Sequence, residues 1–439
     1  MKTVKPPLTH SMTTPLNRLD QLTRLLVWML FALLCASAVW LHRDVPYHDQ
    51  WDLLPLLVRS YQGQLTFSDL LMPHNGHVLL LPQALMLGLA WATHWNTLAE
   101  VICSWLLGGL NYVLLLRLFS ANPPHRLPPA LFRLPLGLLA FSLAQADNWL
   151  WGWQLQVPLC LSAVLTGTLA LRVIASPAVA LGVAALCALA ASVSFAAGVV
   201  FWFAALPLVW QRGARWLGLW LLLTLLCLAA YVWLLSLAGK GTPSFPLDGI
   251  SGWQSLHLLQ NTLRCLGSLP ARFHPVAALL TALLGLAALL WLLHHPATTG
   301  YRALLCSFAL FGVGTALLIA VSRSSLGSEQ MLASRYTTFM LPFWAAVLCP
   351  LLCLPGQARW SGVLLSLLIT YTSATGMTDW QRLHNRLVKG ELALTHPSSP
   401  DGLRALKGIN PRQDPQQAQQ EVALLAQYRL RFYRTHSPP

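Results

Sequence analysis

Two carboxylates stand three positions apart in the segment 46–52, PYHDQWD, directly after the first long apolar run of the chain. Acidic residues are scarce, with 14 Asp and Glu among 439 residues, so a pair of them beside an apolar run suggests chemistry. A positioned carboxylate can act as a general base, and residues three apart share one face of a helix. We take Asp49 and Asp52 as candidate catalytic residues, with Asp52 the more structural of the two. The alternative is a helix cap, with Asp49 at the N-cap and Asp52 at position N3.

A third acid lies in the segment 144–156, AQADNWLWGWQLQ, which joins two apolar runs. An acid beside a bilayer normally has a partner or a function, so we include Asp147 among the catalytic candidates. The amides and indoles around it are candidates for substrate binding: Asn148, Trp149, Trp153 and Gln154. The alternative for the tryptophans is an aromatic belt at the membrane–water interface.

Two arginines flank the segment 322–339, SRSSLGSEQMLASRYTTF. Arg323 follows one apolar run, and Arg335 with Tyr336 opens the next. The planar guanidinium of arginine can bind a phosphate through two parallel hydrogen bonds, which lysine cannot do. We therefore predict that Arg335, Tyr336 and Arg323 contact a phosphate. Snorkelling of the arginines toward the interface is the alternative.

Polar side chains also interrupt the segment 68–83, SDLLMPHNGHVLLLPQ. We expect Ser68 or Asp69 to cap a short helix, after which His74, Asn75 and His77 contact a phosphate or a sugar. Two histidines at i and i+3 are also a possible metal pair, but the sequence offers no third ligand nearby. A divalent metal is left open, and no cofactor is assigned.

Several familiar catalytic motifs are missing from the sequence. It contains no GxGxxG, GxxxxGK[ST], GxSxG or HExxH pattern. Nucleotide hydrolysis, serine hydrolysis and zincin-type proteolysis therefore have no support. The apolar runs also lack the scattered charges that are typical of ion-coupled transporters.

The composition indicates a membrane protein that positions these residues at a bilayer surface. Hydrophobic residues make up 56% of the chain and charged residues 10%, against roughly 25% in soluble domains. The net charge of +14 fits cytoplasmic loops and contact with membrane lipids. Nucleic-acid binding is not expected, because no soluble basic domain is visible.

The apolar runs predict an all-α polytopic protein of about 11 transmembrane helices. The expected spans are 25–41, 98–119, 134–147, 155–174, 178–193, 199–210, 216–236, 276–293, 303–321, 336–354 and 361–375. The first is expected to stay uncleaved. The run 78–93 is short and holds Pro82 and Gln83, so we expect it to lie on or dip into the outer face; a twelfth span is the alternative.

Three regions follow from this topology. We expect a cytoplasmic N-terminal segment at 1–24, a transmembrane domain at 25–375 with surface helices within 42–97, and a helical tail at 376–439 on the outer face. The tail segments DGLRALKGI and QQAQQEVALLAQYRLRFYR predict short amphipathic helices. Four polar segments then meet on the outer face: 42–97, 147–154, 237–275 and 322–335.

This layout resembles the C-type (GT-C) membrane glycosyltransferases, particularly their protein O-mannosyltransferase-like branch. That family has an essential acid in the first outer loop, surface helices before the second span and a second acid after the third. Asp49 or Asp52 matches the first place and Asp147 the second. The stretch HNGH at 74–77 is similar to an HNEHR-like stretch of uncharacterised bacterial members, with Gly76 and Val78 in place of its acid and arginine.

The resemblance implies a function and a location. The expected donor is a sugar on a polyprenyl phosphate, and the acceptor is a glycan, lipid or protein of the cell envelope. Asp49 would take the proton of the acceptor hydroxyl, the sugar would pass across with inversion, and Arg335 would stabilise the phosphate that leaves. The expected place is the outer face of a bacterial inner membrane, with the N-terminus cytoplasmic and the C-terminus periplasmic. A lipid or glycan flippase or another multi-span transporter is the alternative.

Overall fold

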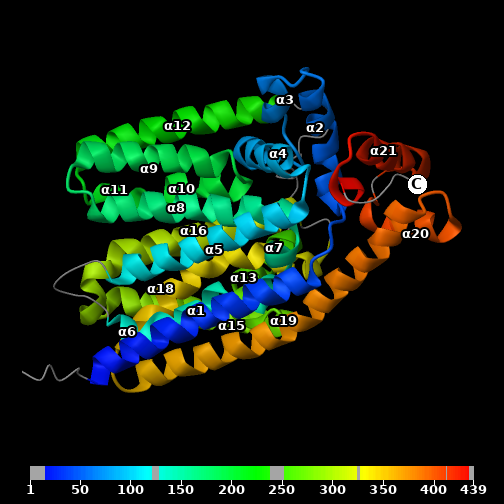
Figure 1. Cartoon of the computed structure of the whole chain (residues 1–439). Coiled ribbons are helices and arrows are strands. Elements are labelled where there is room, and N and C mark those ends of the chain that lie inside the picture. The colour runs from blue at the N-terminus through cyan, green and yellow to red at the C-terminus, as the bar shows by residue number, and fades with distance from the viewer. Residues whose placement is uncertain (1–14, 121–127, 238–251, 324–326, 412, 435–439) are drawn as a thin grey trace, which may run out of the picture.

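The protein is helical throughout the part that the computed structural model describes, which comprises residues 15–120, 128–237, 252–323, 327–411 and 413–434. No strand occurs in these residues, and a single isolated bridge pairs His74 with His77. The long helices lie side by side in one bundle (Figure 1). The expected all-α class is confirmed.

The bundle contains the following helices: α1 (Pro15–Leu41), α5 (Thr97–Ser120), α6 (Pro129–Ala140), α7 (Ala146–Leu150), α8 (Gln156–Val173), α9 (Pro177–Ser192), α10 (Val200–Ala204), α11 (Leu206–Trp210), α12 (Ala214–Ser236), α13 (Gly252–Leu266), α14 (Ser268–Ala271), α15 (Pro275–His294), α16 (Arg302–Arg323), α17 (Ser334–Thr337), α18 (Leu341–Cys353) and α19 (Gln357–Thr395). Short 3₁₀ turns connect several of them: η2 (Leu143–Gln145), η3 (Gly152–Leu155), η4 (Ala196–Val199), η5 (Pro296–Tyr301), η7 (Ser328–Leu332) and η8 (Thr338–Met340).

Eight segments of the described chain are long and apolar enough to cross a membrane: Arg18–Leu41, Thr97–Ser120, Pro129–Leu150, Gly152–Val173, Ala214–Ser236, Pro275–His294, Pro296–Arg323 and Ser334–Cys353. Three shorter apolar helical segments accompany them, at Leu80–Thr93, Pro177–Ser192 and Ala196–Trp210. Two of the expected spans, 178–193 and 199–210, fall on these shorter segments. The last expected span, 361–375, lies within the much longer α19.

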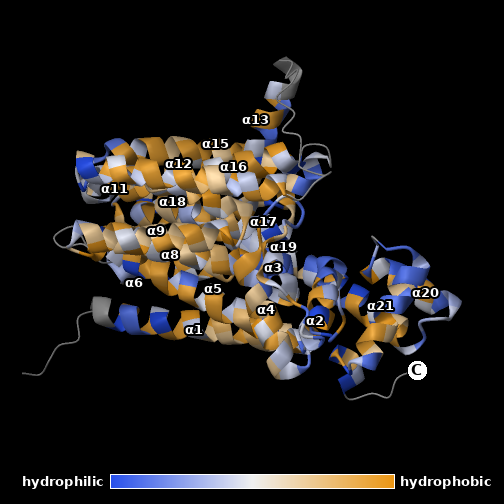
Figure 2. Ribbon diagram, turned by 90° about the horizontal axis from the view of Figure 1, so that it is seen from above, coloured by the Kyte–Doolittle hydropathy of each residue, from blue (hydrophilic) through white to orange (hydrophobic). Residues whose placement is uncertain are grey.

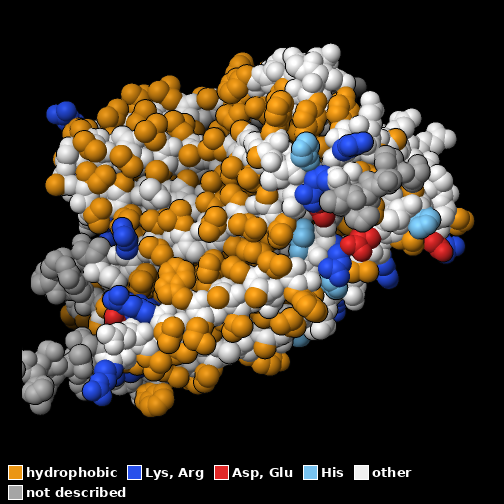
Figure 3. All heavy atoms as spheres, viewed as in Figure 1, with side chains coloured by type: hydrophobic (Ala, Val, Ile, Leu, Met, Phe, Trp, Pro, Cys, Tyr) orange, Lys and Arg blue, Asp and Glu red, His pale blue; other side chains and the backbone are white. Residues whose placement is uncertain are grey.

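The outer surface of the bundle is apolar, as a bilayer solvent requires. Large side chains such as Trp40, Leu106 and Leu284 are 81%, 67% and 71% exposed, which in water would be costly. Figure 3 shows hydrophobic side chains across the middle of the bundle and charged side chains gathered toward its two ends. The protein is therefore a multi-pass helical membrane protein.

One end of the bundle carries the polar elements, and we call it the capped end. It holds η1 (His48–Asp52), α2 (Leu53–Tyr61), α3 (Phe67–Leu71), α4 (Leu80–Thr93), α20 (Pro400–Ile409), α21 (Pro415–Gln427) and η9 (Arg431–Arg434). Figure 1 places α2, α3, α20 and α21 beyond the ends of the long helices, and Figure 2 shows hydrophilic residues concentrated there. The short helix α4 packs against α2, α3, α5 and α8.

Helices α18 and α19 bring distant segments to the capped end. The span that contains α18 is the most enclosed, with 94% of its apolar window buried, so the segment at its start lies near the centre of the bundle. Helix α19 runs unbroken through 39 residues. The domain boundary expected at 375–376 therefore falls inside a helix, and the first part of the tail is the extension of α19 beyond the apolar stretch.

Candidate functional site

The pair Asp49 and Asp52 is held by a 3₁₀ turn whose other residues are anchored in the core. Gln50 and Trp51 are buried. The Gln50 side chain accepts a hydrogen bond from the Tyr47 backbone N–H at 3.2 Å and donates one to Glu100 Oε2 at 2.6 Å. The cap alternative is not what the structure shows: Tyr47 is the N-cap of η1, and Asp52, at the N-cap of α2, makes no capping hydrogen bond with its side chain.

A tight hairpin places His74 beside both acids. His74 and His77 exchange backbone hydrogen bonds of 2.8 and 3.0 Å around a turn formed by Asn75 (φ 49°) and Gly76 (φ 83°). The His74 ring lies 3.9 Å from Asp49 Oδ2 through Nε2 and 3.7 Å from Asp52 Oδ2 through Nδ1. The preceding helix α3 is capped by Thr66 together with Asp69 rather than by Ser68.

The loop between α6 and α8 carries Asp147 to Arg335. Arg335 Nη1 lies 3.7 Å from Asp147 Oδ2, and both side chains are partly exposed. Two hydrogen bonds fix this contact: the Asp147 backbone N–H donates to Ser334 Oγ at 3.2 Å, and Asn148 Nδ2 donates to Thr338 Oγ1 at 2.6 Å. Asp147 and Arg335 thus belong to two spans joined by polar contacts at the capped end.

Arg335 is within electrostatic reach of both acids, Asp147 and Asp49. The charges of both Asp147 and Asp49 act on its guanidinium, which also lies over the Tyr336 ring, 4.9 Å from the ring centre. The charges of Asp147 and Arg335 also act on the phenol of Tyr47, two residues before Asp49. The sequence-predicted Asp49, Asp147 and Arg335 are therefore brought to one place.

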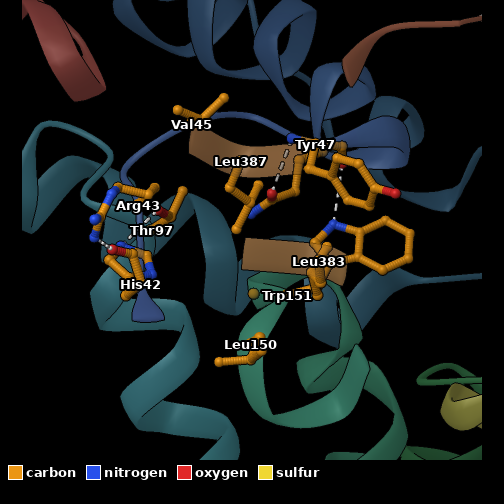
Figure 4. Close-up of a pocket in the computed structure, with 11 residues that line it drawn as sticks. His42, Arg43, Val45, Tyr47, Thr97, Leu150, Trp151, Leu383 and Leu387 are labelled. Atoms are coloured by element: carbon orange, nitrogen blue, oxygen red, sulfur yellow. Dashed lines mark hydrogen bonds between the residues drawn. The ribbon is translucent and has the colours of Figure 1, made fainter. Parts of the chain in front are cut away.

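Arg386 joins this group from α19. Its Nη1 donates a hydrogen bond of 3.0 Å to the Tyr47 hydroxyl, and the charge of Asp147 acts on it. Burial raises the pKa of Tyr47 and the bond from Arg386 opposes that rise, so the phenol stays neutral at physiological pH. The Trp151 indole N–H donates a hydrogen bond of 3.0 Å to the Tyr47 backbone carbonyl. Figure 4 shows Tyr47 and Trp151 at a small pocket that is also lined by Leu383 and Leu387 of α19.

The remaining candidates divide into surface and buried side chains. Asn75 is exposed and bonds to His74 Nε2 at 2.8 Å. Burial, together with the charges of His74 and Arg323, lowers the pKa of His77 to about 3, so this ring is neutral and packs against Phe195. Four other candidates are buried, with at most 3% of each residue exposed: Trp149, Trp153, Gln154 and Tyr336.

These buried aromatic residues support the site rather than line it. The Trp149 indole donates to the Ser142 carbonyl at 3.0 Å, and a Cβ at Gly108 would lie 2.6 Å from its ring. Trp153 presents its ring to His74 at 5.2 Å. Stacking of these indoles on a sugar would require them to leave the core, so their contribution is to hold His74 and the Asp147 loop.

A second buried network connects η1 to the end of the tail, and sequence reasoning missed it. Arg431 is fully buried with its guanidinium 3.8 Å from the centre of the Trp95 ring. Trp95 in turn donates a 2.8 Å hydrogen bond to Glu100, the same acid that accepts from Gln50. Glu100 sits in an apolar run, and an acid in such a run is the signal that could have revealed this network.

Comparison with protein-family models, with curated proteins and with solved structures finds no match to this chain. The class that fold and site define is a multi-pass helical membrane protein with a charged cluster at one end.

Proposed function

We propose that the protein is a membrane glycosyltransferase that moves a sugar from a polyprenyl phosphate to a hydroxyl acceptor of the cell envelope. The observation that carries the proposal is that Arg335 lies 3.7 Å from Asp147 and is also within electrostatic reach of Asp49. Acids and a guanidinium are what such a transfer needs: a base for the hydroxyl and a donor set for the departing phosphate.

The acceptor oxygen forms a bond to the anomeric carbon while the bond from that carbon to the phosphate oxygen breaks, with inversion. The acceptor proton passes to Asp49, and the lipid phosphate leaves as an anion. Arg335 would bind that anion. Arg386, whose guanidinium is also within electrostatic reach of Asp147, would add a second positive charge.

The location of the cluster suits a lipid-linked donor. It lies at the ends of apolar spans, so a lipid tail can remain beside the bundle while its phosphate reaches Arg335. We propose the outer face of a bacterial inner membrane, with the N-terminus cytoplasmic and the capped end periplasmic. The 11-span topology belongs to this proposal.

Transport of a lipid or glycan is the competing function, and it predicts a polar path across the bundle. The buried polar side chains Asn111 of α5 and Ser162 of α8 instead pair locally. Ser162 donates to Asn111 Oδ1 at 2.8 Å, and Asn111 Nδ2 donates to the Pro158 carbonyl at 3.1 Å. This local pairing favours the transferase.

The test is complementation of a strain that lacks the chain, with the envelope glycans profiled by mass spectrometry. Asp49→Asn and Asp147→Asn should lower glycan transfer by about 10² to 10⁴, and Arg335→Ala by about 10² to 10³. Asp401→Asn is the matched control, since this acid is 74% exposed and pairs only across one helix turn with Arg404. A strain whose glycans are unchanged by loss of the chain, or three variants as active as the control, would contradict the proposal.

A further inference from the structure

Two carboxylates and an imidazole from separate segments surround one point at the capped end. Asp49 and Asp52 come from η1, and His74 comes from the hairpin at 74–77. Their ligand atoms all lie within 4.8 Å of one another. The separations of 3.9 and 3.7 Å between the His74 nitrogens and the two carboxylates exceed hydrogen-bond length. The three groups are therefore spaced around a small volume.

We propose that Asp49, Asp52 and His74 bind one divalent transition-metal ion. One imidazole with two carboxylates suits Mn²⁺, Zn²⁺ and similar ions, whereas Mg²⁺ and Ca²⁺ prefer sites made of oxygen alone. Three protein ligands leave further coordination positions for water or a phosphate oxygen, as in sites that bind a substrate rather than sites that only hold a fold. His77, the expected second histidine, does not belong to this group, because its ring packs against Phe195.

The spacing fits an ion after small side-chain rotations. Metal–ligand bonds of about 2.1 Å place neighbouring ligands roughly 3.0 to 3.4 Å apart in octahedral and tetrahedral sites. Since the ligand atoms lie within 4.8 Å of one another, the most widely separated of them must approach by up to about 1.5 Å. The side chains of Asp49 and His74 are 18% and 15% exposed, and that of Asp52 is 36% exposed, so the site is enclosed on one side and open on the other.

His74 is oriented as a metal-binding histidine usually is, by a partner on its second nitrogen. Asn75 lies 2.8 Å from Nε2. The atom of Asn75 that faces Nε2 is the amide nitrogen Nδ2, and a 180° rotation of this amide, which keeps its shape, presents Oδ1 to Nε2–H instead. Nδ1, which faces Asp52 at 3.7 Å, is then the nitrogen that is free to bind the ion. The Trp153 ring packs against the imidazole with ring centres 5.2 Å apart, so the imidazole does not need to be ordered when the ion binds.

The surrounding charge favours a cation. A third acid, Glu421 on α21, is within electrostatic reach of Asp52. Burial is the main cause that raises the pKa of Glu421 to about 7, and the negative charge of Asp52 acts in the same direction. Arg335, whose guanidinium is within electrostatic reach of Asp49, already lies 3.7 Å from Asp147. An ion would therefore relieve repulsion among acids that the fold holds together.

This site does not depend on sugar transfer, although the two proposals are compatible. One oxygen of Asp49 would face the ion and the other the acceptor hydroxyl. A phosphate held between the ion and Arg335 would then join the two halves of the cluster. Metal binding is measurable whatever group the protein transfers.

The experiment is a Mn²⁺ titration of the full-length, chelator-stripped protein in detergent, read by the electron paramagnetic resonance signal of free Mn²⁺. Mn²⁺ is chosen over Zn²⁺ because the chain has nine free cysteines that bind zinc readily. We expect one bound ion per chain, with pulsed spectra that show the ¹⁴N coupling of an imidazole. Asp52→Asn and His74→Gln should each weaken the Kd at least about tenfold.

The controls are Asp401→Asn and His257→Gln, which alter an exposed acid and an exposed histidine outside the cluster and should bind as the unmodified protein does. The proposal is overturned if the unmodified chain binds no Mn²⁺ at millimolar concentration. It is equally overturned if the bound ion shows no nitrogen coupling, a result that needs no variant to fold. Binding that persists in both cluster variants marks an adventitious ion elsewhere.

Discussion

Arg386 donates a 3.0 Å hydrogen bond to the hydroxyl of Tyr47, across 339 positions of the sequence. The contact ties the extension of α19 to the turn that carries Asp49. Because Tyr47 is 5% exposed while Arg386 lies at the surface, the buried phenol depends on this arginine for its partner. The tail is thus part of the cluster's support and not only a cover.

The first prediction concerns that bond. Tyr47→Phe and Arg386→Ala should each lower the stability of the detergent-solubilised protein by about 1 kcal/mol, the usual net value of such a bond. The double variant should lose little more than either single variant, because both remove one interaction. Thermal unfolding followed by tryptophan fluorescence measures all three. Losses that simply add would show that the two residues act separately.

A second prediction concerns a close approach of α19 to the Asp147 loop at Gly376. A Cβ at Gly376 would lie 2.5 Å from the Leu143 carbonyl oxygen, which is backbone and cannot rotate away. Gly376→Ala should therefore lower stability by about 1 to 3 kcal/mol and displace the loop that holds Asp147. Gly182→Ala in α9 is the matched control, since nothing lies within 4 Å of its Cβ and alanine favours a helix by about 1 kcal/mol. Equal melting temperatures for the two variants would refute the close approach.

Apolar and amphipathic patterns in the sequence predicted most of the helices but not all of their bounds. The apolar runs predicted most of the long helices, because each satisfies its own backbone in lipid. The same patterns predicted α20 and α21 from the tail segments. The helix that contains the expected span 361–375 continues to Thr395, which the apolar pattern could not predict because the chain becomes polar where it leaves the apolar stretch.

The cluster was predictable only in part. Asp49, Asp147 and Arg335 stood out because charges beside apolar runs are rare. The approach of His74 to Asp52, and of Arg386 to Tyr47, depends on how the hairpin and α19 fold back over η1. No spacing in the sequence encodes those contacts, because they join segments that are 22 and 339 positions apart.

A third prediction concerns Arg431. Its guanidinium is fully buried over Trp95, and burial lowers its pKa to about 10 despite the nearby charges of Glu100 and Asp44. None of its three guanidinium nitrogens has a hydrogen-bond partner among the described residues. Arg431→Ala should lower stability by about 3 to 5 kcal/mol, because it leaves Glu100 buried without a counter-charge. Arg404→Ala, at an arginine whose side chain is 83% exposed, should change stability by less than about 0.5 kcal/mol. A loss of stability in Arg431→Ala as small as that in Arg404→Ala would mean that the buried Arg431 side chain does not stabilise the capped end.

The last prediction is a pH dependence that originates at Glu421. Burial is the main cause that raises the pKa of this carboxyl from 4.5 to about 7, and the charge of Asp52 acts in the same direction, against a 2.6 Å hydrogen bond from Asn410. Between these two pH values the folded chain keeps a proton that the unfolded chain has released. The stabilising contribution is therefore complete below about pH 4.5 and is lost as the pH rises through 7.

The melting temperature should accordingly fall between pH 5 and pH 8, by the equivalent of about 1 to 2 kcal/mol once solvent screening is allowed for. Glu421→Gln keeps the shape and the neutral state of the protonated acid, so it should remove this component and be the more stable protein at pH 8. Glu329→Gln, at an exposed acid, should retain the full pH dependence. Since α21 faces Asp52, Mn²⁺ binding at the acid pair should also strengthen from pH 5 to pH 8 as Glu421 ionises, and this gain should be smaller in Glu421→Gln. A Glu421→Gln protein with an unchanged pH profile would place the titrating group elsewhere.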